Sequence, residues 1–130
     1  MKITDKRGNL IAIYQKSSEI KKAKNFLTNQ SQEFQFGTFH LEAGEEIERH
    51  MHNEQSRSIK GTSEAIVVIE GSLEIEFFDE EKEFIKKIIM SENDSLLILS
   101  GGHGIKILKE CKFVEFKQGP YIEDIDKEHF

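Results

Sequence analysis

The chain has 130 residues, of which 37% are hydrophobic and 32% are charged, and its formal net charge is −6. This length and composition predict one soluble domain, residues 1–130, around a single core. The acidic balance argues against nucleic acid as a partner, because nucleic-acid binders carry a basic excess. No apolar run reaches the roughly 18 residues of a membrane span, and the opening MKITDKRGNL lacks the apolar segment of a signal peptide. We therefore expect a cytoplasmic protein without a membrane partner.

Apolar residues recur with a period of two along most of the chain, which is typical of half-buried strands. In chain order, strands are expected over 9–14, 34–41, 64–70, 71–79, 84–90, 96–100, 105–108 and from 111 onward. Residues 17–27 suit a helical turn or a strand equally well. Short strands separated by frequent turn signals predict an all-β class, with a sandwich or a barrel as the architecture.

Glycines mark two expected interruptions of this strand pattern. Gly71 separates two apolar runs and predicts a tight hairpin turn between them. The stretch GGHG at 101–104 is expected to end one strand before the next begins. The lone cysteine, Cys111, excludes an internal disulfide and a thiolate zinc cluster. It lies in an alternating run, so we expect a small buried hydrophobe rather than a nucleophile.

Three histidines and one glutamate form the candidate metal site. His50 and His52 stand one residue apart at the expected end of a strand over 47–52, so their side chains share a face. Glu64 opens the next strand and lies near the same mouth if the two strands pair. His103, between glycines, follows another strand and could complete the set. Imidazoles with a carboxylate suit a divalent ion of Fe, Mn, Ni, Cu or Zn. The alternative interpretation is that each of these residues is an ordinary residue of a loop, a turn or a strand edge.

The same residues resemble the first motif of the cupin superfamily, G-x5-H-x-H-x3–4-E-x6-G. The matching positions are Gly44, His50, His52, Glu64 and Gly71. The chain departs from the motif in having eleven residues between the second histidine and the glutamate, an insertion that costs little loop entropy at a hairpin turn.

The second cupin motif, G-x5-P-x-G-x2-H-x3-N, is represented by His103 alone. Ile98, Ser100 and Ile107 stand where it has Pro, Gly and Asn. The stretches GTSE, VIEG, SGGHG and KQGPY also resemble a subgroup of small single-domain cupins that accompany sugar and surface-polysaccharide biosynthesis. The resemblance covers roughly residues 34–121 and leaves N-terminal strands and a C-terminal tail outside.

The resemblance implies a double-stranded β-helix, or jelly-roll barrel, with one divalent metal ion inside and a homodimeric assembly. The implied metal ligands are His50, His52, Glu64 and His103. Possible substrate contacts are Arg49, Arg57, Lys60, His40, Phe36 and Tyr121. His129, close to the end of the sequence, is expected to be exposed.

Three functions are compatible with this site. The first is a metal-dependent enzyme acting on a small polar metabolite, such as a sugar or a sugar nucleotide, as an isomerase or epimerase, with an oxygenase possible on the same ligands. The second is a ligand-binding or sensor protein without turnover. The third is a metal-free sugar-nucleotide ketoisomerase, in which His50 or His52 acts as general base. Fold alone does not decide among them, and no catalytic residue is assigned.

Overall fold

The computed structural model describes residues 1–122 and 125–130. The chain divides into two compact units: unit 1 comprises Met1–Glu19 and Gly61–Phe130, and unit 2 comprises Ile20–Lys60. Antiparallel strands are the main regular structure of both units, so the predicted all-β class is confirmed. Within the described residues, no helix has the length and apolar character needed to cross a membrane.

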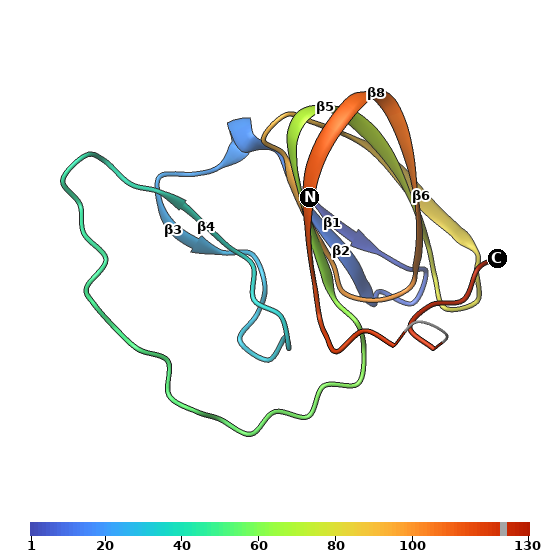
Figure 1. Ribbon diagram of the computed structural model, residues 1–130, viewed down its shortest axis with the longest axis horizontal. Helices are drawn as coiled ribbons and strands as arrows, with labels where there is room; N and C mark the ends of the chain where they lie inside the picture. The colour runs from blue at the N-terminus through green and yellow to red at the C-terminus, as the bar shows by residue number, and fades with distance from the viewer. Residues whose placement is uncertain (123–124) are drawn as a thin grey trace. The chain divides into compact units, whose positions relative to one another are not determined.

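Unit 1 is built on one antiparallel sheet. Its elements are β1 (Lys2–Thr4), β2 (Leu10–Gln15), the 3-10 turn η1 (Ser17–Glu19), β5 (Glu64–Phe78), β6 (Phe84–Ser91), β7 (Ser95–Ile98) and β8 (Gly102–Lys117). The strands follow the order β1-β2-β7-β5-β6, and β8 pairs with β5. Figure 1 shows β5 and β8 as two long arcs that run side by side.

The core of unit 1 lies on one face of β5, as the alternation of its sequence predicts. Leu73, Ile75 and Phe77 are fully buried there, together with Ile66 and Val68 from the first half of the strand. They pack against apolar residues of the neighbouring strands, namely Ile3, Ile11, Ala12, Tyr14, Ile88, Met90, Leu96 and Ile98. Cys111 is half-buried against this cluster, so the expectation of a small buried hydrophobe is confirmed only in part.

The predicted hairpin at Gly71 is wrong, because β5 continues through this residue without a turn. Gly71 has a φ of 82°, and the register between β5 and β8 shifts on both sides of it. A Cβ at this position would lie 1.9 Å from the carbonyl oxygen of Glu110 on β8. The glycine therefore forms a bulge pressed against its partner strand. A left-handed glycine suits both a turn and a bulge, and the sequence signal is the same for both.

The predicted interruption at 101–104 is also wrong in part. The chain leaves β7 at Ile98, but β8 begins already at Gly102 and runs without a break to Lys117. The strands expected at 105–108 and from 111 are thus one strand. Gly104 has open space beside its Cα, so here glycine is compatible with extended backbone rather than a sign of a turn.

Unit 2 holds a short hairpin and a long irregular stretch. Strands β3 (Ala23–Phe26) and β4 (Gly37–His40) pair antiparallel. Residues 46–60, all of which the structure describes, form no strand. The expectation that 47–52 ends a strand paired with 64–70 is therefore wrong, since β5 pairs instead with β6, β7 and β8. The stretch is rich in charged and polar residues and lacks the apolar alternation that would give it a buried face.

Candidate functional site

Glu64 and His103 lie at opposite ends of the β5–β8 ladder, and yet their side chains are in contact. Glu64 is opposite Lys117 in the ladder, whereas His103 is opposite Phe77. Along β5 these positions are thirteen residues apart, which in a straight strand would be about 43 Å. Their contact therefore requires that the paired strands bend back strongly on themselves.

The connection between β7 and β8 explains the bend. Glu64 is opposite Ile98 of β7, and Phe78 is opposite Gly102 of β8. The chain between Ile98 and Gly102 can span about 14 Å at most, so the two ends of β5 are held close together. The bulge at Gly71 lies midway along β5, where the ladder changes register, and bulges of this kind bend a strand. The local conformation of Gly71 thus helps to assemble a site at the strand ends.

The contact itself joins a carboxylate and an imidazole. His103 Nε2 lies 3.1 Å from Glu64 Oε2, and the two side chains are 26% and 13% exposed. The hydrogen bond that His103 donates holds the pKa of Glu64 below its ordinary value, against the opposing effect of burial. Glu64 is consequently a carboxylate at neutral pH.

Lys117 is the second partner of Glu64. Its Nζ lies 3.4 Å from Glu64 Oε1, 3.7 Å from Glu115 Oε1 and 3.8 Å from Asp126 Oδ2. It also lies 5.3 Å from the centre of the Tyr121 ring. Burial works to lower the pKa of Lys117, but the surrounding carboxylates outweigh it and raise the pKa above its ordinary value. The ammonium is therefore charged, and each oxygen of Glu64 has its own neighbour.

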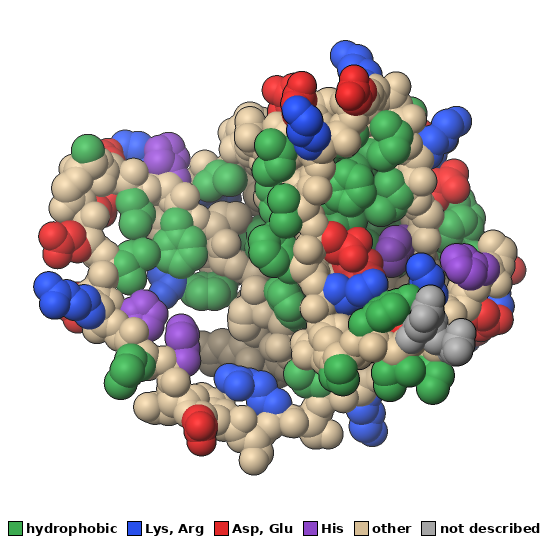
Figure 2. Space-filling model, in the orientation of Figure 1, with side chains coloured by type: hydrophobic (Ala, Val, Ile, Leu, Met, Phe, Trp, Pro, Cys, Tyr) green, Lys and Arg blue, Asp and Glu red, His purple; other side chains and the backbone are tan. Residues whose placement is uncertain are grey.

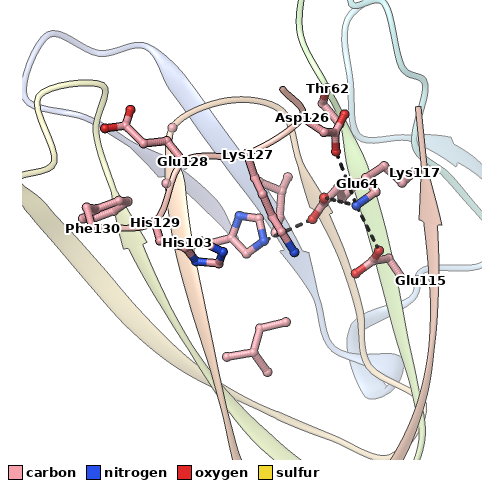
Figure 3. A pocket seen from close by; sticks show the side chains of 14 residues that line it. Thr62, Glu64, His103, Glu115, Lys117, Asp126, Lys127, Glu128, His129 and Phe130 are labelled. Atoms are coloured by element: carbon pink, nitrogen blue, oxygen red, sulfur yellow. Dashed lines mark ion pairs between the residues drawn. The ribbon is translucent and has the colours of Figure 1, made fainter. Parts of the chain in front are cut away.

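These side chains line a pocket of about 540 Å³ in unit 1. Figure 3 shows His103, Glu64 and Lys117 together, with Asp126 and Glu115 on either side of the ammonium. Ile98, Ile105 and Phe130 supply apolar lining, and the other lining residues are Thr62, Gly101, Gly102, Lys127, Glu128 and His129. Figure 2 shows hydrophobic side chains gathered on this unit beside a hollow where acidic, basic and histidine side chains meet.

The segment 126–130 forms part of the wall and is attached to the sheet at several points. Phe130 packs edge-on against Phe78, with ring centres 5.2 Å apart. Lys82 pairs with Glu128 at 2.8 Å and lies over the Phe130 ring. A Cβ on Gly102 would come within 2.7 Å of that ring, so the glycine leaves space for it. Residues near both ends of β5 and residues of the segment 126–130 thus line the same pocket.

The donor chemistry of Glu64 and His103 fits a metal ion. An imidazole and a carboxylate are donor types that first-row divalent ions take in proteins. The hydrogen-bonded second oxygen of Glu64 is also typical of a carboxylate ligand. Among residues 1–122 and 125–130, however, no group of three or more His, Cys, Asp or Glu side chains has an arrangement that could hold an ion.

The other two predicted ligands, His50 and His52, belong to unit 2. Their rings are 5.2 Å apart in an edge-on arrangement, and both are exposed. His50 Nδ1 lies 2.8 Å from the carbonyl oxygen of Glu48. The structure therefore gives two pairs of candidate ligands, one in each unit, and the set of four stays a prediction.

Of the six predicted substrate contacts, Tyr121 lies beside the charged residues of the pocket, next to Lys117. The other five belong to unit 2: Arg49, Arg57 and Lys60 in its irregular stretch, Phe36 just before β4 and His40 at the end of β4. His40, Arg49, Arg57 and Lys60 are exposed, and Phe36 is half-buried.

Sequence reasoning did not place Lys117 and Glu115 beside Glu64. Lys117 comes beside Glu64 because the two residues are directly opposite in the β5–β8 ladder, and Glu115 shares their face two residues earlier. The register of distant strands carries this information, and no local pattern does. His129 is exposed, as expected, and it also borders the pocket.

No family model matches the chain, and neither the curated proteins nor the solved structures contain a significant match.

Proposed function

We propose that the chain is a cupin-type, metal-binding protein that acts on a small polar metabolite, with sugar isomerisation or epimerisation as the reaction. The proposal includes a jelly-roll barrel, a cytoplasmic location and a homodimer, as the resemblance to cupins implies. The observation that carries it is the contact between Glu64 and His103, two ligand-type side chains brought together from opposite ends of a long ladder.

Each candidate residue would have a definite role. Glu64 and His103 would hold the ion, with His50 and His52 as the further ligands that the motif assigns. A divalent ion supplies a Lewis acid that polarises a carbonyl or hydroxyl group. Lys117 lies beside the second oxygen of the same carboxylate. Ile98, Ile105 and Phe130 would supply apolar contacts to one side of the bound molecule.

The size and charge of the pocket support a sugar as the ligand. A volume of about 540 Å³ is within the range of small-molecule sites. Glu64, Glu115, Asp126 and Glu128 line it against Lys117 and Lys127, so carboxylates outnumber ammonium groups. This balance favours a neutral sugar, whose hydroxyls can donate to carboxylates, over the diphosphate of a sugar nucleotide.

The direct hydrogen bond between His103 and Glu64 favours a second candidate, metal-free acid–base catalysis. A carboxylate that orients an imidazole is a common arrangement for a general base. This version predicts turnover without a metal, and the same residues would be needed for it.

Metal content separates the two. Tag-free protein is loaded anaerobically with Fe²⁺, Mn²⁺, Ni²⁺ or Zn²⁺, dialysed, and analysed by mass spectrometry. We expect roughly one ion per chain, lost in His103→Ala and Glu64→Gln and retained in the control His40→Ala. A His50→Ala/His52→Ala double variant tests the ligands from unit 2. Wild-type protein that retains none of these ions contradicts the metal site, and aldose isomerisation in such protein would support the metal-free version.

A further inference from the structure

Lys117 occupies the centre of the charged cluster. Its ammonium lies within 4 Å of carboxylates from β5, from β8 and from the segment after β8, and the dashed lines that mark these three contacts meet at this atom in Figure 3. Glu64 is the shared member, because its other oxygen contacts His103. A positive charge is thus already bound beside the carboxylate to which the proposed function assigns a metal ion.

We propose that Lys117 is a built-in competitor for the divalent cation, so that the ion binds at Glu64 and His103 against the charge of this ammonium. The inference rests on the proposed function and adds a means of setting the affinity of the site for the metal ion. Lys117 reduces the negative charge available to the ion and engages Glu64 Oε1, which could otherwise serve as a second donor oxygen.

The structure gives Lys117 a route away from the site. Its side chain is 27% exposed and belongs to the last residue of β8, and a lysine carries its charge on a flexible four-carbon stem. Glu115, at 3.7 Å, is 37% exposed and could keep the ammonium after it leaves Glu64. Movement of one side chain would then exchange an internal cation for a metal ion.

The alternative role for Lys117 is to position Glu64, and it predicts the opposite sign. If the ammonium mainly fixes the carboxylate in a ligating orientation, its removal loosens Glu64 and weakens metal binding. If it mainly competes, its removal strengthens metal binding, because two like charges no longer repel across a short distance. Affinity for the metal alone therefore decides between them.

The test is a calorimetric titration of Co²⁺ into the full, tag-free chain. Lys117→Met is expected to bind about tenfold more tightly than the wild type, and Lys117→Gln should behave alike. Lys117→Arg keeps the charge and is expected to remain within about twofold of the wild type. Lys112→Met is the matched control, since Lys112 is on the same strand in an exposed pair with Glu70. Thermal unfolding of each variant verifies that it is folded.

The outcomes separate this inference from the proposed function. Tighter binding by Lys117→Met and Lys117→Gln, with the controls unchanged, supports competition. Equal or weaker binding by both overturns it, while a loss of binding in His103→Ala would leave the metal site standing. Binding that is unaffected by His103→Ala, or no binding by either wild type or Lys117→Met, overturns the metal site and the role of Lys117 together.

Discussion

Replacing Gly71 with alanine tests whether the bulge in β5 is a structural requirement of unit 1. A non-glycine residue at positive φ costs about 1–2 kcal/mol, and Gly71 has a φ of 82°. The new Cβ would also lie 1.9 Å from the backbone oxygen of Glu110, which no side-chain rotation can relieve. Strand displacement of this kind adds about 1–3 kcal/mol. The smaller entropy of the unfolded alanine chain returns about 0.4–1 kcal/mol.

We therefore expect Gly71→Ala to lower the free energy of unfolding by about 1–5 kcal/mol, a large part of the roughly 5–15 kcal/mol of a typical domain. Urea unfolding followed by circular dichroism measures this change. Gly104→Ala is the control, because its Cβ would meet nothing within 4 Å, and its effect should stay within about 0.5 kcal/mol. Equal effects of the two substitutions would refute the reasoning from the bulge.

Three further predictions concern the core and two carboxylates. Tyr14→Phe removes the O–H that donates to buried Asp94 at 2.6 Å and should cost about 1.5–3 kcal/mol at neutral pH. Burial and the Asp94 hydrogen bond raise the pKa of Tyr14 above its ordinary 10.0. The free energy of unfolding of the wild type should therefore fall as the pH rises above 10. Urea titrations at several pH values should show no such fall from this position in the variant. The pKa of Glu64 lies below its ordinary 4.5, held there by the His103 hydrogen bond. Its contribution to the free energy of unfolding is therefore present above pH 4.5 and lost as the pH falls through the folded-state pKa. Glu64→Gln should reduce the loss of stability at acidic pH in the same titrations, and an unchanged loss would contradict this. Phe77→Ala empties a fully buried position and should cost about 3–5 kcal/mol by urea unfolding, far more than Phe116→Ala at a 57% exposed ring.

The strands of unit 1 were largely predictable because burial of one sheet face leaves a direct signal in the sequence. The alternation through Leu73, Ile75 and Phe77 identifies the core face of β5, and all three residues are buried. The apolar run at 9–14 likewise corresponds to β2. Side chains on a strand point to opposite faces in turn, so local sequence is sufficient for such elements.

The errors share a different physical origin. Gly71 and the glycines at 101–104 were expected to interrupt strands, but glycine specifies which backbone conformations are allowed and not which one is used. At Gly71 the choice depends on Glu110 of β8, nearly forty residues away in sequence. The strand expected at 47–52 would need a free edge of β5 to pair with. The first residues of β5 pair with β7 on one side and with β8 on the other, so neither edge is free there.

The candidate site depends on the same long-range geometry. Residue type and spacing were enough to single out Glu64 and His103, and the structure places their side chains in contact. The placement of Lys117 beside Glu64 could not be predicted in this way, because it is fixed by the register between β5 and β8. A shift of one residue in that register would turn Lys117 to the other face of the sheet. The β7–β8 connection and the bulge at Gly71 bring the ends of β5 together, and the strand register sets which cation accompanies the carboxylate. The charge of the site is therefore a property of the fold rather than of the motif.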